Sequence, residues 1–173
     1  MSCPVFISYA HSASAPDALA LADKLGHLAF LDTDAIDDGE AFPQRSLDGV
    51  LDARVVVIFA TKSYTERRFC RLEMRMAVAG CDAEARQIVL ALGNGSNAVL
   101  ETMPAAIADR SWPQAGEPER LSMLVRQRLS VADAAIRDRL PMGEPQRLGA
   151  VFLEESNVPE PRSLQGVTFR FLG

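Results

Sequence analysis

The sequence is poor in the residue types that mark several common protein classes. Its 173 residues include three cysteines, two histidines and one tryptophan. Cys3, Cys70 and Cys81 have neither CxxC nor Cys/His spacing, which argues against a disulfide framework and a zinc site and is typical of a reducing cytosol. We therefore expect no metal site and a cytoplasmic location.

Long apolar runs and basic blocks are also missing. No segment approaches the roughly 20 apolar residues of a membrane span. The N-terminal stretch "MSCPVFISYAHS" has no basic region before a long apolar core, so we expect no signal peptide and no membrane association. The net charge of −5 comes without a compensating basic block, which argues against direct nucleic-acid binding. A content of 48% hydrophobic and 24% charged residues is typical of a globular domain.

Strand-like apolar runs alternate with helical patterns along most of the chain. Strands are expected at Pro4–Tyr9, His27–Asp32, Val55–Ala60 and Gln87–Leu92, with a short fifth one at Asp109–Trp112. Helices are expected at Asp17–Gly26, Phe42–Ala53, Arg67–Gly80 and Pro118–Leu140. This order predicts an α/β fold, a flavodoxin-like three-layer sandwich with a five-stranded parallel sheet. In such sheets, ligands bind beyond the carboxyl ends of the strands.

Residues 141–173 have a different composition from the rest. Prolines and glycines interrupt them, and "VTFRFLG" at the end alternates like a strand. This stretch is either an extra strand or the beginning of another domain, and we favour the second interpretation. The expected organisation is therefore one domain at 1–140, followed by a linker or the start of a following domain at 141–173.

The segment "RRFCRLEMRMAVAG" (Arg67–Gly80) places a carboxylate among apolar neighbours. On a helix, the expected solvent side comprises Arg68, Arg71 and Arg75, and the expected buried stripe comprises Phe69, Leu72 and Met76. Glu73 lies one turn after Phe69, where an ionised group is costly to hold. Such a residue either extends to solvent, pairs with a lysine or arginine, or has a function.

Three motifs in order resemble the Toll/interleukin-1 receptor (TIR) domain family in its bacterial form. "VFISYAH" resembles the family's first box, an apolar strand that ends in Ser-Tyr. "AFLDTDAIDDGEAF" is similar to the second strand and the BB loop, where a strand-end Asp leads to a Gly and then an aromatic residue. "SYTERRFCRLE" resembles the third-helix signature, an aromatic residue, a Cys, two residues and a Glu. The resemblance covers about Pro4 to Trp112.

This resemblance implies an NAD+ glycohydrolase. Many bacterial TIR domains cleave NAD+, and their catalytic residue is the Glu of the third helix, which is Glu73 here. NAD+ is then the substrate, and no cofactor is expected. The reaction expels neutral nicotinamide from a cation, so no general acid is needed, and the ribose passes through an oxocarbenium-like state. A fixed carboxylate in a poorly solvated site stabilises that charge, and the products are nicotinamide and ADP-ribose or a cyclic isomer.

The resemblance also implies a set of substrate-binding residues. They are Ser8, Tyr9, His11, Asp32, Gly39, Phe42 and Phe69. Asp32 and Phe42 are expected near the nicotinamide ribose, and Gly39 lets the BB loop turn. Phe69 stands where the family more often has Trp, and the alternative to substrate binding is that its ring only packs in the core. For His11, the alternative to substrate binding is a role in the turn that ends the first strand. The BB loop from Asp32 to Phe42 is rich in carboxylates, but it does not have the ligand and glycine spacing of an EF-hand calcium site.

The family also implies partners. In this family a neighbouring TIR domain completes the site, so we expect a homo-oligomer or filament on activation, a sensor domain or partner beyond Gly173, and the effector role of a bacterial antiphage immune system. The alternative is a non-catalytic TIR adaptor that mediates signalling assembly. A response-regulator receiver lacks support, because "SYAH" and "FATKS" stand where it needs acidic residues. A nucleoside deoxyribosyltransferase, which uses a similar sheet and a catalytic Glu, is a further enzyme alternative.

Overall fold

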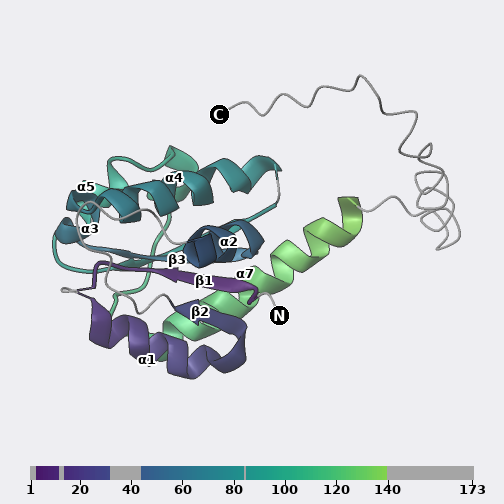
Figure 1. Ribbon diagram of the computed structural model, residues 1–173, viewed down its shortest axis with the longest axis horizontal. Helices are drawn as coiled ribbons and strands as arrows, with labels where there is room; N and C mark the ends of the chain where they lie inside the picture. Colours follow the sequence, from purple (N-terminus) through teal and green to yellow (C-terminus); the bar gives the residue numbers. More distant parts are fainter. Residues whose placement is uncertain (1–2, 12–13, 32–43, 84, 140–173) are drawn as a thin grey trace, which may run out of the picture. The chain divides into compact units, whose positions relative to one another are not determined.

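A parallel β-sheet forms the centre of the structure (Figure 1). The computed structural model describes residues 3–11, 14–31, 44–83 and 85–139. In chain order the elements are β1 (Val5–Ser8), α1 (Ala15–Leu25), the 3-10 helix η1 (Gly26–Leu28), β2 (Ala29–Leu31), α2 (Gln44–Asp52), β3 (Val55–Ala60), α3 (Lys62–Glu66), α4 (Arg68–Ala83), β4 (Gln87–Leu92), α5 (Asn97–Leu100), α6 (Ala105–Ala108) and α7 (Pro118–Arg139).

The strands have the order β2-β1-β3-β4, and every pair is parallel. Val5 of β1 is in register with Ala29 of β2 and with Val55 of β3, which in turn is in register with Gln87 of β4. All residues of the two central strands are buried. Strands that are covered on both faces need apolar side chains at every position, and the sequences VFIS and VVVIFA largely meet this need. The predicted α/β fold with a parallel sheet is confirmed.

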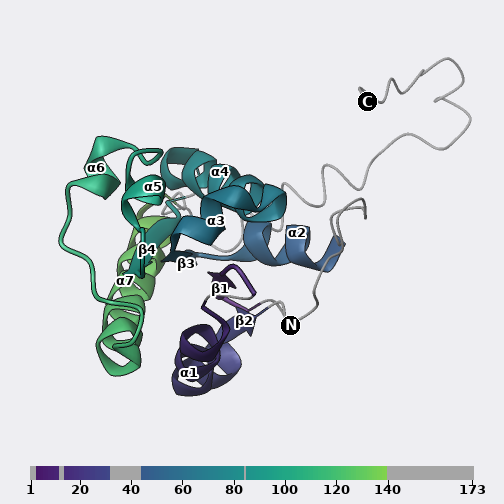
Figure 2. The same cartoon turned by 90° about the vertical axis from the view of Figure 1, so that its left-hand side faces the viewer.

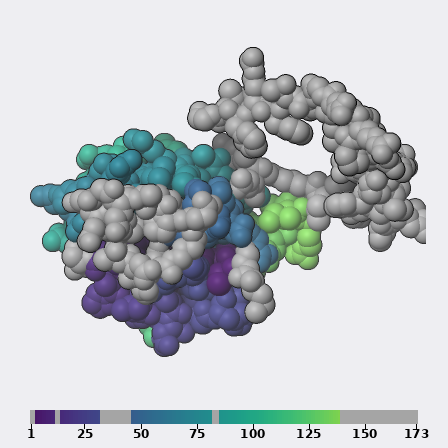
Figure 3. Space-filling model, in the orientation of Figure 1, coloured from purple at the N-terminus to yellow at the C-terminus, as the bar shows by residue number. Residues whose placement is uncertain are grey.

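Helices cover both faces of the sheet. Helices α1 and α7 pack against each other on one face, and α2 and α4 pack against each other on the other, together with the short α3 and α5 (Figures 1 and 2). In the space-filling view, α1 gives the purple surface at the bottom and α4 the teal surface at the top (Figure 3). The strands therefore end at a rim between two helical layers, where ligands of open α/β sheets bind.

The expected fifth strand at Asp109–Trp112 is not formed, and among the described residues the sheet has four strands. A single parallel bridge between Leu92 and Gln114 takes its place. Asp109, Arg110 and Ser111 are exposed, because polar side chains of this kind are unfavourable in a buried strand of the sheet. The Trp112 side chain is instead held by a hydrogen bond of 2.9 Å from its indole nitrogen to the carbonyl oxygen of Ile107 in α6.

Helix α4 differs from its predicted form in its buried face and in its end. The buried residues are Cys70, Glu73, Met74, Ala77 and Gly80. The expected stripe was wrong by one position, because Leu72 is 39% exposed and Phe69 and Met76 are only partly buried. The physical reason is that the carboxylate itself belongs to the buried face. The helix also continues past Gly80 to Ala83.

Several expectations fall on segments that are not described. They include the BB-loop residues Asp32, Gly39 and Phe42 and the interpretation of residues 141–173. The elements given above belong to a unit that spans Met1–Arg139. None of the helices within the described ranges has the length and apolar character to cross a membrane.

Candidate functional site

Glu73 lies on the inner face of α4, where this helix packs against β1. Its side chain is only 8% exposed, so it does not extend into solvent. Ser8, the last residue of β1, donates a hydrogen bond from its hydroxyl to Glu73 Oε2. Ser8 therefore faces α4. The carboxylate thus lies next to the carboxyl end of a central strand.

A third residue, Tyr64 of α3, completes this cluster. Its side chain is fully buried, and its phenolic oxygen lies 2.6 Å from Ser8 Oγ. The cluster therefore connects one residue from each of β1, α3 and α4, and we call it the Ser8–Tyr64–Glu73 network. Residues from three elements that meet at a sheet rim fix one another's orientation more strongly than residues of a single loop would.

The surroundings of Glu73 are poorly solvated and contain groups that stay neutral. Burial raises the pKa of Tyr64 well above its ordinary value of 10.0, and the negative charge of Glu73 raises it further. Burial and the same carboxylate raise the pKa of the Cys70 thiol from 9.0 to about 12. Both effects arise because a second negative charge near Glu73 is unfavourable away from water. A carboxylate in such a place interacts strongly with positive charge that develops beside it.

Tyr9 and His11 pair with each other just after β1. Their ring centroids are 4.7 Å apart with an interplanar angle of 32°, and Tyr9 Oη lies 3.5 Å from His11 Nδ1. The Cys70 thiol of α4 lies 3.6 Å from the Tyr9 carbonyl oxygen and donates to it. Tyr9 is buried and His11 is exposed, so the pair extends from the core to the surface at the rim.

Phe69 lies one turn before Glu73 on α4. Its ring is partly buried, and the guanidinium carbon of Arg68 lies 6.0 Å from the ring centroid. Of the predicted site residues, the structure therefore brings Ser8 into contact with Glu73. Phe69 lies near Arg68, and the Tyr9–His11 pair contacts Cys70. Asp32, Gly39 and Phe42, the remaining predicted site residues, lie outside the described residues.

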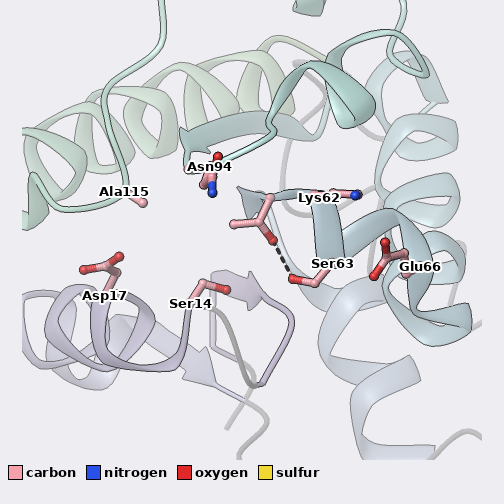
Figure 4. A pocket seen from close by; sticks show the side chains of 9 residues that line it. Ser14, Asp17, Lys62, Ser63, Glu66, Asn94 and Ala115 are labelled. Atoms are coloured by element: carbon pink, nitrogen blue, oxygen red, sulfur yellow. Dashed lines mark hydrogen bonds between the residues drawn. The ribbon is translucent and has the colours of Figure 1, made fainter.

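A separate crevice of about 410 Å³ opens at the same rim, and residues after β1, β3 and β4 line it (Figure 4). It is lined by Ser14, Asp17, Thr61, Lys62, Ser63, Glu66, Gly93, Asn94 and Ala115. The hydroxyls of Thr61 and Ser63 are 3.1 Å apart and form the hydrogen bond drawn in Figure 4. Glu73 is not part of this lining. The crevice has the position expected for a ligand site in this fold and combines hydroxyl, amide, carboxylate and ammonium groups.

Sequence reasoning missed Tyr64 as a site residue. It stands five positions before Phe69 in a short helix, α3, that was not predicted. Tyrosine is rarely fully buried without a hydrogen-bond partner, and a tyrosine four residues after a buried strand was the available signal. What the sequence could not give is the partner, because Ser8 is 56 residues away.

A comparison with protein-family models identifies the family of this chain. The model of the TIR domain family matches residues 5–125. No curated protein matches the chain at a significant level. Among solved structures, the TIR domains of the activated Roq1 resistosome directly recognizing the pathogen effector XopQ are similar, with 18% identity, a TM-score of 0.44, and coverage of 87% of this chain and 98% of that one. Since the family model spans most of the chain, this protein belongs to the TIR domain family.

Proposed function

We propose that this TIR domain is an NAD+ glycohydrolase of the bacterial type and that Glu73 is its catalytic residue. The observation that carries the proposal is the position of a buried carboxylate at the carboxyl end of the central strands, with the Ser8 hydroxyl donating to it. The same residue is the glutamate of the third-helix motif. A structural salt bridge at the surface would explain neither the burial nor the contact with the strand end.

The proposed reaction breaks the C1′–N bond between ribose and nicotinamide. Nicotinamide leaves with the bonding electron pair and becomes neutral, so it needs no proton. The positive charge moves to the ribose, and the Glu73 carboxylate stabilises it at the stage where C1′ has the least electron density. Water then adds to C1′ and loses a proton, which gives ADP-ribose. If a nitrogen or hydroxyl group of the same nucleotide adds instead, a cyclic isomer forms.

The residues around Glu73 have consistent roles in this proposal. Phe69 offers a partly buried ring one turn away, to which a flat nicotinamide can stack. The Tyr9–His11 pair is connected to α4 by the Cys70 contact, and we propose that it contacts the nucleotide. Asp32, Gly39 and Phe42 of the BB loop are proposed to close the ribose side.

We further propose that assembly controls the activity. A neighbouring TIR domain would complete the site, and a sensor domain or partner beyond Gly173 would drive association in the cytoplasm as part of an antiphage response. A dilute monomer would then be nearly inactive, and nicotinamide release would rise faster than linearly with protein concentration. Release measured over a dilution series, next to sedimentation of the same samples, tests this control.

The decisive experiment replaces Glu73 by Gln. This substitution keeps the size and the ability to accept the Ser8 hydrogen bond but removes the charge. Nicotinamide release by assembled protein should fall by about 100-fold or more, whereas the melting temperature should stay near that of the wild type. Glu101→Gln, which changes an exposed carboxylate after α5, is the matched control and should keep full activity.

Two outcomes would contradict the proposal in different ways. Equal release by Glu73→Gln and wild type would show that another group performs the chemistry. If the assembled wild type released no nicotinamide from NAD+ or NADP+, the protein would be a TIR adaptor that acts by association alone.

A further inference from the structure

The hydrogen atoms of the Ser8–Tyr64–Glu73 network can be assigned by counting donors. A serine hydroxyl has one hydrogen to donate. Ser8 donates it to Glu73 Oε2, because an ionised carboxylate is an acceptor only. The contact of 2.6 Å between Ser8 Oγ and the Tyr64 hydroxyl must then run the other way, with Tyr64 as the donor. The network is a directed chain from Tyr64 to Ser8 to Glu73.

We propose that Tyr64 is a positioning residue, which acts through Ser8 to hold the Glu73 carboxylate in one orientation. This inference rests on the proposed function of Glu73. Tyr64 is fully buried on α3 and Ser8 is 1% exposed at the end of β1, so neither hydroxyl is placed to contact a nucleotide. With its hydrogen given to Glu73 and a lone pair taken by Tyr64, Ser8 acts on the carboxylate and not on NAD+.

The Tyr64 end of the chain keeps its donor at high pH. Burial and the Glu73 charge raise the pKa of Tyr64, so its hydroxyl keeps the hydrogen that it donates. The Tyr64 bond in turn prevents the Ser8 hydroxyl from rotating, because rotation would break both hydrogen bonds at once. Hydrogen bonds in such a chain strengthen one another. A side chain of α4 is thereby oriented by two other elements of the fold.

Tyr64→Phe tests the positioning role by removing one oxygen atom. We expect kcat for nicotinamide release to fall about tenfold, similar to the loss when an orienting partner of a metal ligand is removed, with KM changed less than about twofold. Val125→Ala is the control for general destabilisation. Val125 is fully buried in α7 on the opposite face of the sheet, and this variant should leave kcat near the wild-type value. An unchanged kcat in Tyr64→Phe would overturn the proposal.

A double-mutant cycle tests whether Tyr64 acts through Ser8. We expect Ser8→Ala to lower kcat at least as much as Tyr64→Phe does. In the Ser8→Ala background, Tyr64→Phe should cause almost no further loss, because the link to Glu73 is already broken. If the fold loss in kcat of the double variant equals the product of the two single losses, the two residues act independently, as two ordinary packing contacts would. That result would refute the directed chain.

A measurement that needs no activity separates this inference from the proposed function. The buried Tyr64 hydroxyl hydrogen should exchange slowly with water and give a proton NMR signal that Tyr64→Phe removes. The signal should shift in Ser8→Ala and also in Glu73→Gln, which lies two hydrogen bonds away. If the wild type cleaves no NAD+ but these shifts appear, the chain stands and only the catalytic role fails. If Glu73→Gln leaves the signal unchanged, the chain is wrong even where the enzyme is active.

Discussion

One buried charged side chain lies in the first half of α4 and another lies just beyond the end of this helix, and the two are held in different ways. Within the described residues, Glu73 and Arg86 are the charged side chains that are buried, at 8% and 3% exposure. Glu73 lies at the carboxyl edge of the sheet, where the side-chain hydroxyl of Ser8 donates to it. Arg86 follows α4 and directly precedes β4, at the amino edge.

Three backbone carbonyl oxygens accept hydrogen bonds from Arg86. Its Nε donates to the carbonyl oxygen of Ala53 at 3.0 Å, and its two Nη atoms donate to those of Met76 and Leu51 at 2.9 Å each. Leu51 and Ala53 lie at the end of α2, where helix carbonyls lack partners within the helix and carry partial negative charge. Arg86 therefore joins α2 and α4 to the strands and has the contacts of a structural residue.

The comparison separates two uses of a buried charge. Arg86 donates to three carbonyl oxygens that the folded helices bring together, so these bonds stabilise the fold. Glu73 is oriented by side chains at the rim where ligands bind in this class of sheet. Changes at the two positions should therefore affect different measurements, stability at the amino edge and chemistry at the carboxyl edge.

The largest effect on stability is expected from Arg86→Met. Methionine fills much of the same volume but leaves the carbonyls of Leu51 and Ala53 without a donor, and each buried orphan costs about 1–3 kcal/mol. We expect the free energy of unfolding to fall by about 3 kcal/mol and the melting temperature by about 10 °C. Denaturant unfolding and thermal melting measure this, with Glu73→Gln as the contrast that should lose activity and keep stability. If the two variants were equally destabilised, the separation of roles would be wrong.

Much of the fold could be predicted because its signals are local. The runs VVVIFA and QIVLAL coincide with β3 and β4, since a doubly covered strand needs apolar residues throughout. The fifth strand could not be predicted from its short stretch, because a single bridge to Leu92 depends on where the chain arrives in space. The choice of Glu73 also came from the sequence, through the motif order, and its burial agrees with the expected environment.

The site's supporting residues could not be predicted because their signals are not local. Tyr64 and Ser8 come together only through the packing of α3 against α4 and of α4 against β1. The buried face of α4 was misplaced by one position, because the stripe was drawn through Phe69, Leu72 and Met76, whereas the buried face has Glu73 at its centre. Arg86 gave no periodic signal at all, and its role follows from carbonyls of two distant helices.

A smaller loss of stability is expected from Gly80→Ala. A Cβ atom at this position would lie 2.2 Å from Nη1 and 2.5 Å from Cζ of Arg86. Gly80 is thus inside α4 to leave room for the guanidinium group, and it does not end the helix. Alanine favours helices by about 1 kcal/mol over glycine, so the clash must outweigh that gain. We expect a net loss of about 1–2 kcal/mol, measured by denaturant unfolding.

The double variant sharpens this test. If the loss comes from the clash, Gly80→Ala should cost nothing, or even stabilise, in the Arg86→Met background, where the guanidinium group is gone. The same loss in both backgrounds would show that the glycine serves another purpose.

The smallest effect concerns pH and the surroundings of Glu73. The pKa of Cys70 is raised from 9.0 to about 12 in the folded protein, first by burial and then by the Glu73 charge. A raised pKa means that the folded state keeps the thiol hydrogen while the unfolded chain loses it. The resulting stability is complete below about pH 9 and is lost as the pH rises from there toward 12, by at most about 1.4 kcal/mol per pH unit.

Cys70→Ala isolates this contribution because every other titrating group is retained. Between pH 8.5 and pH 10, the free energy of unfolding of the wild type should fall by about 1 kcal/mol more than that of Cys70→Ala. Denaturant unfolding at both pH values provides the measurement. In Glu73→Gln, which keeps Cys70, the free energy of unfolding should depend less on pH at high pH. One of the two causes of the raised pKa of Cys70 is then removed, while burial remains. Parallel curves for wild type and Cys70→Ala would mean that the thiol beside Glu73 is solvated, and the carboxyl edge would then lack the poorly solvated surroundings on which the comparison with Arg86 depends.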